Sequence, residues 1–373
     1  RLPPSPNLFI AETRADDSPK FSNHAHKSAG ARARAAKLLA RASVPVARYG
    51  GFSDFHEYPM PLPNNPIMFA NNPLDRAGNL RRDPDWVKAR LADETALFVP
   101  LWQLNPLVLP EMAEGEGRDV GWLPRAALAD AVDEQTLTVF LGINRRGKPL
   151  FAADISRLSN PEDDGPFRGM GVFEDLRALA SAGDMPDTEL AILAQAKGML
   201  DWHLRHGFCS QCGSPTRMAE AGYKRVCDNC GAEHFPRTDP VVIMLATHED
   251  ACLVGRQKGW PDGMFSSLAG FMEPGETIEE AVAREMQEEA GIEINRVRYF
   301  GTQPWPFPAS MMIGCLAEAA GRDITLDDEE LEEAHWISRE DVRRAMNGDG
   351  PIGVPPRMAI AHQLMKAFAD GAG

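Results

Sequence analysis

Four glutamates and one arginine between residues 270 and 292 have the types and the spacing needed for metal chemistry. The segment reads GFMEPGETIEEAVAREMQEEAGI, and it fits the pattern G-x5-E-x7-R-E-(apolar)-x-E-E-x-G-(apolar) at every fixed position. Clustered carboxylates are ligands that Mg²⁺ and Mn²⁺ prefer. Such ions neutralise negative charge and lower the pKa of bound water, so the segment indicates a site for metal-assisted chemistry.

A helix is expected to present these carboxylates. Thr277 and Glu280 form a capping-box pattern, and Gly291 suits a left-handed C-terminal cap. We therefore predict a helix from about residue 278 to about residue 290. Its apolar face is formed by Ile278, Ala281, Val282 and Met286.

Three glutamates project largely toward that apolar face, namely Glu285, Glu288 and Glu289. The opposite face carries Glu280, Arg284 and Gln287. Burying like charges costs several kcal/mol unless positive charge compensates, so we predict bound Mg²⁺ or Mn²⁺. A solvated acidic helix end is the alternative. Glu276 precedes the helix, and it is expected to pair with Arg284 or to join the metal shell.

The composition is that of an acidic chain with several domains. Its 373 residues are 43% hydrophobic, which is enough for two or three cores. The net charge is −15, and an acidic body disfavours a dedicated nucleic-acid binder. No stretch approaches 18 consecutive apolar residues, so we predict no membrane span.

Four of the six cysteines have the spacing of a zinc ribbon, namely Cys209, Cys212, Cys227 and Cys230. Gly213 and Gly231 follow the two pairs and suit tight knuckle turns. Two disulfides are the alternative, but they would need an oxidising compartment. Four thiolates leave no open position, so we predict a structural Zn²⁺ separate from the catalytic ions. We expect Cys252 and Cys315 to be core thiols, and His203 and His206 to be structural rather than alternative zinc ligands.

Residues 1–53 form a basic segment rich in Pro, Ala and Arg, and residues 18–53 contain seven Lys or Arg and no acid. The composition of 27–48 fits an organellar transit peptide, but it also fits a solvated helix or a disordered arm. We prefer the flexible arm. The expected localisation is cytoplasmic, with organellar targeting left open.

The remaining chain is divided into an N-terminal globular α+β domain over 54–190, a helix and zinc ribbon over 191–238, and a C-terminal domain over 239–373. Helices are expected at 188–206, 338–346 and 357–369. Strands are expected at 97–101, 107–109, 137–143, 149–153, 240–246, 251–256, 297–300 and 311–317, with a loop at 257–269. Strands on both sides of the glutamate-rich helix predict an α/β/α sandwich with a mixed sheet.

A second motif follows the carboxylates. Residues 303–310 read QPWPFPAS, in which prolines alternate with aromatic residues to give a rigid wall. The 270–292 segment is identified as a Nudix box. Together with this wall and the ribbon, it makes residues 176–368 resemble the NADH pyrophosphatase family of Nudix hydrolases, whose signature SQPWPFPxS is altered only by Thr302. A loop that merely caps the core is the alternative.

The resemblance implies roles for several further residues. Phe271 is expected to stack on nicotinamide, and Glu330 matches a glutamate outside the box that binds metal or acts in catalysis. The implied substrate wall includes Gln303, Trp305, Phe307, Ser310 and Met312. Ala361 corresponds to a main-chain contact, and Phe235 stands where the family often has tyrosine. The resemblance also implies a homodimer.

These features predict an NAD(H) diphosphatase that produces nicotinamide mononucleotide and AMP. Glu285, Glu288, Glu289 and Glu330 are the predicted metal-site residues, and Glu288 or Glu330 is the expected base. Because the reaction is phosphoanhydride hydrolysis, NADH or NAD⁺ is substrate and not cofactor. No G-x-G-x-x-G follows a strand, so a dehydrogenase has no support. Removal of an NAD cap from RNA and hydrolysis of other nucleoside diphosphate compounds are alternatives. A zinc-ribbon binding module with an inert box is a more distant one.

Overall fold

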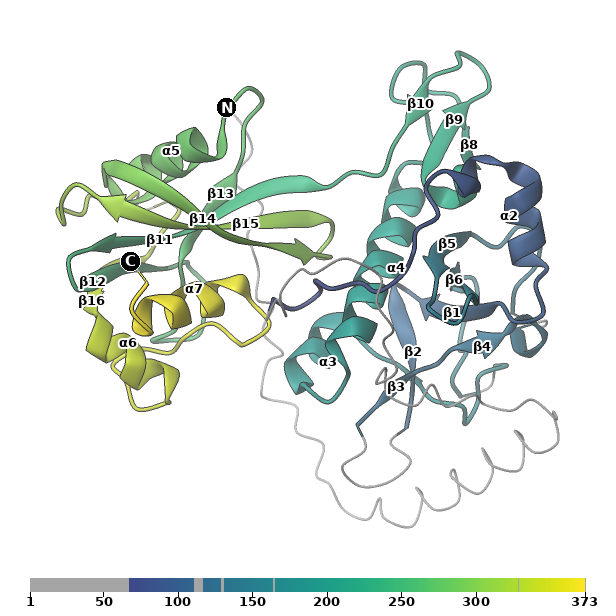
Figure 1. Ribbon diagram of the computed structural model, residues 1–373, viewed down its shortest axis with the longest axis horizontal. Coiled ribbons are helices and arrows are strands. Elements are labelled where there is room, and N and C mark those ends of the chain that lie inside the picture. Colours follow the sequence, from purple (N-terminus) through teal and green to yellow (C-terminus); the bar gives the residue numbers. More distant parts are fainter. Residues whose placement is uncertain (1–66, 111–116, 129–130, 164, 328, 373) are drawn as a thin grey trace, which may run out of the picture.

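The computed structural model describes residues 67–110, 117–128, 131–163, 165–327 and 329–372. The basic segment 1–53 lies outside these residues. Two lobes are joined along one side, and a small ribbon projects from the N-terminal lobe (Figure 1). No helix in the described part of the chain is long and apolar enough to cross a membrane.

The N-terminal lobe is a mixed sheet with helices. Its strands are β1 (Leu97–Trp102), β2 (Asn105–Leu109), β3 (Asp119–Val120), β4 (Leu123–Pro124), β5 (Thr138–Ile143), β6 (Pro149–Asp154) and β7 (Val172–Phe173). Its helices are η1 (Leu80–Arg82), α2 (Pro84–Leu91), η2 (Arg125–Leu128), α3 (Leu176–Ala182) and α4 (Asp187–Arg205). The strand order is β3-β2-β1-β6-β5, with β1 and β6 parallel. All four strands predicted here and the helix α4 are confirmed within one or two residues.

Both faces of this sheet are buried. Leu97, Val99 and Leu101 pack toward the core that contains α4, whereas Phe98 packs into a second cluster with Phe140 and Phe151. This alternation follows from the two-residue period of a strand. The strand therefore reads as a continuous apolar run, as expected for a doubly covered strand.

Glu189 on α4 is a buried carboxyl in this lobe, only 8% exposed. Trp122 Nε1 donates a hydrogen bond to its Oε2 at 3.0 Å. Burial raises the pKa of Glu189 to about 7, and this outweighs the opposing hydrogen bond. The pKa of Glu189 is higher in the folded than in the unfolded protein. Its contribution to stability is therefore fully present below the unfolded pKa of about 4.3 and is lost as the pH rises through 7.

We therefore expect the stability of Glu189→Gln, relative to that of the unaltered protein, to be greater at pH 8 than at pH 5. The glutamine retains an acceptor for Trp122. The difference in unfolding free energy between variant and unaltered protein should shift by about 3 kcal/mol across that range. Urea unfolding followed by tryptophan fluorescence would measure it. Glu134→Gln is an exposed control that should show no shift. Parallel pH profiles for all three proteins would contradict the prediction.

The zinc ribbon consists of β8 (Thr216–Ala219), η3 (Glu220–Gly222), β9 (Lys224–Cys227) and β10 (Glu233–His234), in the order β10-β9-β8. Gly213 and Gly231 have φ values of 75° and 74°, and their amides donate to the carbonyls of Cys209 and Cys227 at 2.9 Å. These left-handed turns confirm the predicted knuckles.

The two histidines near the ribbon have structural partners, as predicted. His203 Nε2 donates to the Gly222 carbonyl at 2.7 Å, and its Nδ1 faces Arg225 at 2.9 Å. His206 Nδ1 donates to the Trp202 carbonyl at 2.8 Å. The His203 contacts join α4 to the ribbon, whereas the His206 bond closes the C-terminal end of α4.

The C-terminal lobe contains a six-stranded sheet between helices. Its strands are β11 (Asp239–His248), β12 (Ala251–Arg256), β13 (Leu268–Phe271), β14 (Ile294–Trp305), β15 (Ser310–Ala319) and β16 (Glu333–Ser338). Its helices are α5 (Ile278–Ala290), α6 (Arg339–Met346) and α7 (Ile360–Ala369). The order is β14-β15-β11-β12-β16, β13 pairs with β11, and β11 and β15 are parallel.

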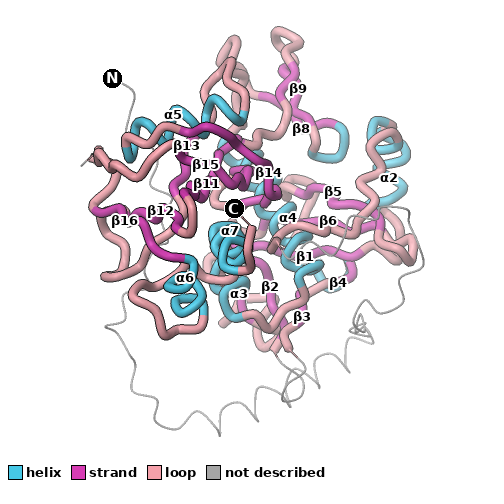
Figure 2. The backbone as a smooth tube through the Cα atoms, turned by 60° about the vertical axis from the view of Figure 1, so that its left-hand side comes forward, coloured by secondary structure: helices cyan, strands magenta, loops and turns pink. Residues whose placement is uncertain are grey.

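Helices cover both faces of this sheet, which confirms the predicted sandwich (Figure 2). Val242 and Met244 of β11 pack toward α5, whereas Val241 and Ile243 pack toward α7. The predicted loop 257–269 was wrong at its end, because β13 begins at Leu268. Strand β16 was not predicted, since it is held by pairing with the distant β12.

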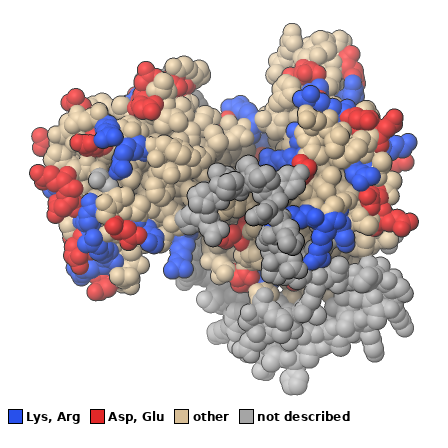
Figure 3. All heavy atoms as spheres, in the orientation of Figure 1, with Lys and Arg blue, Asp and Glu red and all other residues tan. Residues whose placement is uncertain are grey.

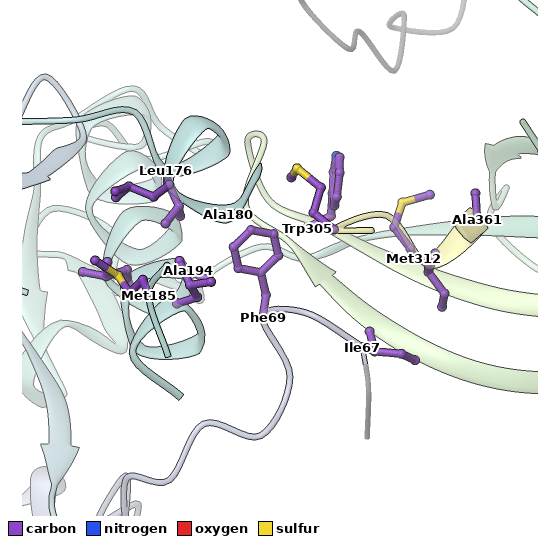
Figure 4. Packing of buried hydrophobic residues seen from close by; sticks show 14 of the residues in the cluster. Ile67, Phe69, Leu176, Ala180, Met185, Ala194, Trp305, Met312 and Ala361 are labelled. Atoms are coloured by element: carbon purple, nitrogen blue, oxygen red, sulfur yellow. The ribbon is translucent and has the colours of Figure 1, made fainter. Parts of the chain in front are cut away.

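The two lobes share one apolar junction. Phe69, whose side chain is 2% exposed, lies between the helices of the N-terminal lobe and Trp305 of the C-terminal lobe (Figure 4). Its ring meets Trp305 edge-on with 6.3 Å between centroids. Helix α4 also crosses the boundary predicted between residues 190 and 191, and the proposed division of the chain at 54–190, 191–238 and 239–373 stays a prediction.

Candidate active site

Local sequence determines where the helix α5 begins and ends. The Thr277 hydroxyl accepts from the Glu280 amide at 3.2 Å, while the Glu280 carboxylate accepts from the Thr277 amide at 2.8 Å. Gly291 has φ 67° and closes the helix. The predicted bounds, 278–290, are confirmed, because capping depends on neighbouring residues only.

Three carboxylates meet at the inner end of this helix. Oxygens of Glu285, Glu289 and Glu330 lie within 4.8 Å of one another. Glu289 is 3% exposed and Glu285 is 7% exposed, whereas Glu330 is exposed on the loop before β16. Burial, followed by the charge of Glu285, raises the pKa of Glu289 well above its usual range.

This cluster fits a hard divalent cation. Its donors are all carboxylate oxygens, and two of the three carboxyl groups are buried. The neighbouring cation Arg284 pairs with only one of them, Glu285. Such an arrangement is unfavourable unless a positive charge occupies it. Glu285, Glu289 and Glu330 are therefore the residues that would hold Mg²⁺ or Mn²⁺.

Gly270 explains how Glu285 fits against the sheet. A Cβ atom built on Gly270 would lie 1.8 Å from the Glu285 carboxyl carbon. Strand β13 therefore needs glycine here so that the carboxylate can lie flat over its backbone. The pattern in the sequence includes this glycine, but the reason for it appears only when β13 and α5 are packed together.

Arg284 lies in the middle of α5. It was predicted on the face opposite the apolar one, but its side chain is partly buried and reaches toward β13. Its side chain is 24% exposed and pairs with Glu276 at 2.5 Å, as predicted for Glu276. It also reaches Glu285 and Glu288 at 2.9 Å each, and Nη2 donates to the Phe271 carbonyl at 2.9 Å. Arg284 thus orients Glu285 and ties α5 to β13.

Glu288 does not share the buried face, contrary to the prediction. Its side chain is 59% exposed, and it contacts Arg284 instead of the other carboxylates. Position 288 lies at the edge of the apolar sector, so helical period alone did not decide its burial. Glu288 is therefore not one of the three clustered carboxylates.

A solvent-open pocket lies beside the cluster, with Glu289 on its wall. Other lining residues come from β12, β13, the segment before α7, and α3 of the N-terminal lobe. Trp260 and Met358 line it and were not predicted. A Trp or Met in a loop of unassigned structure gave no distinct signal in the sequence.

Most of the predicted substrate wall borders this pocket. Gln303, Trp305, Met312 and Ala361 line it, and all four are buried. The Gln303 amide is fully used within the protein. Its Nε2 donates to the Met68 and Met358 carbonyls, and its Oε1 accepts from the Ile360 amide at 2.8 Å. Gln303 therefore holds the wall against α7.

Two of the four remaining predicted residues adjoin the pocket, and the other two lie apart from its lining. Phe271 lies two residues after Ala269 on β13, so it shares the face of Ala269, which lines the pocket. Phe307 packs on Trp305 with 5.2 Å between ring centroids. Ser310 is buried at the start of β15, and Phe235 is 61% exposed beside the ribbon. The structure does not bring Phe235 to the pocket of its own chain.

The four cysteines are arranged as a closed metal site. Cys209 and Cys230 sulfurs are 3.6 Å apart, and Cys212 and Cys227 sulfurs are 3.5 Å apart. Tetrahedral zinc with bonds of about 2.3 Å places sulfurs roughly 3.8 Å apart, so the donors fit Zn²⁺. All six cysteines are free of disulfides, and Cys252 and Cys315 are buried, as predicted.

Three family models match consecutive parts of the chain. The NUDIX domain matches residues 236–354, and the NADH pyrophosphatase zinc ribbon domain matches 204–235. The NADH pyrophosphatase-like rudimentary NUDIX domain matches 95–202, so the N-terminal lobe is related to the catalytic one. That relation was not predicted, because the lobe has no carboxylate pattern.

The chain is also similar to named proteins over most of its length. It is 36% identical to the NAD-capped RNA hydrolase NUDT12 of Homo sapiens, over 80% of this chain and 72% of that one. It is 35% identical to the NAD(P)H pyrophosphatase NUDT13, mitochondrial, of Mus musculus, over 75% and 86%. An NAD-capped RNA hydrolase of Schizosaccharomyces pombe is 32% identical, over 83% and 94%. The chain belongs to the NADH pyrophosphatase family of Nudix hydrolases.

Proposed function

We propose that this protein is an NAD(H) diphosphatase that hydrolyses NADH or NAD⁺ to nicotinamide mononucleotide and AMP. The carrying observation is that Glu289, one of three clustered carboxylates, forms part of the wall of an apolar pocket. A diphosphate held at the cluster would leave one nucleotide ring within the pocket. Relatives named for NAD(P)H and for NAD-capped RNA support this substrate class.

The carboxylates are proposed to have two roles, metal binding and proton abstraction. Glu285, Glu289 and Glu330 would hold Mg²⁺ or Mn²⁺, which when bound neutralises the diphosphate and activates water. Arg284 keeps Glu285 in place through its 2.9 Å contact. Glu330 is the better candidate for the base, because Glu288 points to solvent and is engaged by Arg284.

Product analysis with Mg²⁺ and with Mn²⁺ tests the proposal. NADH and NAD⁺ should each give nicotinamide mononucleotide and AMP in equal amounts. Diadenosine polyphosphates and ADP-ribose serve as comparison substrates for other diphosphates. No cleavage of either dinucleotide with either metal would reject the proposed function.

Phe271 is proposed to stack on the nicotinamide ring. Stacking on an aromatic side chain contributes roughly 1–3 kcal/mol per ring, so Phe271→Ala should lower kcat/KM for NADH about 10- to 100-fold. ADP-ribose lacks nicotinamide and should be affected much less. Tyr299→Ala, a 63% exposed aromatic on β14, is the matched control. Equal losses on NADH and ADP-ribose would assign Phe271 to the fold instead.

Removal of an NAD cap from RNA is the second candidate, since two relatives bear that name. The same bond in the same dinucleotide is cut. On the face that Figure 3 shows, Lys and Arg are mixed with Asp and Glu on both lobes. Competition between NADH and NAD-capped RNA at physiological salt would rank the two substrates.

We also propose a homodimer. Large apolar side chains are exposed around the ribbon, namely Leu204, Phe208, Met218 and Phe235, with Phe208 at 70% and Phe235 at 61%. Such a patch suits burial against a second copy, which would also carry Phe235 toward a neighbouring pocket. Sedimentation analysis should give twice the chain mass, and a monomer at micromolar concentration would reject it.

We propose that the protein is cytoplasmic, with an organelle as the alternative location. The mouse relative is named mitochondrial, and a 46% identical relative of Arabidopsis thaliana, covering 47% of this chain, is named chloroplastic. Both names support the organellar alternative. Imaging of the full-length protein would decide between the compartments.

A further inference from the structure

Two cations from the N-terminal lobe face the same ring of the predicted substrate wall. The Arg177 guanidinium carbon is 4.2 Å from the Phe307 ring centroid, and Lys197 Nζ is 6.0 Å from it. Arg177 is also 5.3 Å from the Trp305 centroid, and it lines the pocket whose wall includes Glu289. The helices α3 and α4 thus bring positive charge to the edge of the catalytic pocket.

Neither side chain forms an ion pair or a hydrogen bond within the described part of the chain. The carboxylates that could neutralise them are otherwise engaged. Asp175 Oδ1 accepts from the Arg177 and Ala178 amides at 2.9 and 3.1 Å, where it caps α3. Asp201 Oδ1 pairs with Arg205 at 2.9 Å. Neither cation therefore has a direct ion pair, although the charges of Asp175 and Asp201 lie near enough to attract them.

Both cations are partly removed from water. Burial lowers the pKa of each. The charge of Asp175 opposes this for both side chains and that of Asp201 for Lys197, while repulsion from Arg177 lowers the pKa of Lys197 further. Partly buried like charges that lack a direct ion pair are unfavourable, and an anionic ligand would relieve this. Because a guanidinium that stacks on a ring by its face keeps its N–H donors at the edge, Arg177 retains donors for such a ligand.

We propose that Arg177 and Lys197 form a subsite for a phosphate monoester carried by the nucleotide in addition to the cleaved diphosphate, such as the 2′-phosphate of NADP(H). This inference rests on the proposed function. A relative is named for NAD(P)H, and the inference assigns the residues of this chain that would favour the phosphorylated dinucleotide over NAD(H). A phosphate monoester carries a charge of about −1.5 to −2 at neutral pH, which matches two cations. A phosphodiester of an RNA chain carries only one negative charge, so it matches them less well.

Calorimetric titration of the full-length protein with 2′,5′-ADP and 5′-AMP, in EDTA and 0.15 M salt, tests the subsite. The unaltered protein should bind 2′,5′-ADP at least about 10-fold more tightly than 5′-AMP, the scale of charge-assisted hydrogen bonds. Arg177→Met and Lys197→Met should each lower this ratio about 10-fold, and Arg177→Lys should lower it less. Lys88→Met, on exposed α2, removes a similar charge away from the pocket and should not change the ratio.

The outcomes separate the subsite from the proposed function, because neither probe contains a diphosphate to be cleaved. A preference for 2′,5′-ADP that depends on both cations supports the subsite whether or not NADH is hydrolysed. Equal affinities for the two probes in a protein that cleaves NADH would overturn the subsite alone. The dinucleotide pApG carries a phosphodiester in place of the monoester, and a stronger preference for pApG would overturn it in favour of RNA.

Discussion

Replacement of Glu289 by glutamine is expected to lower turnover by about 10²- to 10⁴-fold while the fold remains intact. Glu289 is the most buried of the three clustered carboxylates and the one on the pocket wall. Glutamine has nearly the same shape but no negative charge, so it would weaken the binding of the divalent ion that stabilises the developing charge. Steady-state hydrolysis of NADH measures this loss.

The same variant should reveal its cause through stability. Added Mg²⁺ raises the melting temperature of a protein that binds it only when folded. Glu289→Gln should lose most of that rise, although its melting temperature without metal should be equal or higher, because a buried like charge is removed. Glu279→Gln makes the same chemical change on an exposed position of α5 and should keep both activity and the Mg²⁺ response. Near-normal turnover in folded Glu289→Gln would remove this residue from the mechanism.

The second large effect is expected at the zinc ribbon. Cys227 has no exposed surface, and Cys227→Ser removes one of four thiolates that close the site. Structural zinc contributes roughly 10–16 kcal/mol to the folding of small zinc domains, so the ribbon should unfold and zinc should drop from one per chain to near zero. Elemental analysis and the melting temperature measure these two changes.

A matched control and a chelation experiment separate the two kinds of metal. Cys315→Ala removes a buried thiol of β15 outside the ribbon, and its zinc content should stay near one per chain. Brief EDTA treatment should stop hydrolysis, and Mg²⁺ should restore it, while the closed thiolate site keeps its zinc. A zinc content near zero in unaltered protein purified under reducing conditions would contradict the ribbon assignment.

Sequence by itself determined the features that depend on nearby residues. The bounds of α5 follow from Thr277, Glu280 and Gly291, each within a few residues of the helix end it sets. The knuckle glycines Gly213 and Gly231 likewise act through hydrogen bonds to residues four positions earlier. Capping and turn geometry are short-range effects, so pattern and structure agree there.

Tertiary structure alone decided which of these groups meet. Glu330 was expected only from the family resemblance, and it joins Glu285 because the loop before β16 folds over the end of α5. Helical period left the burial of Glu288 and Arg284 undecided, since β13 and Glu276 determine which of the two is covered. The contact of Arg177 with Phe307 spans two lobes and 130 positions. Such contacts depend on the packing of distant elements, which no local pattern in the chain specifies.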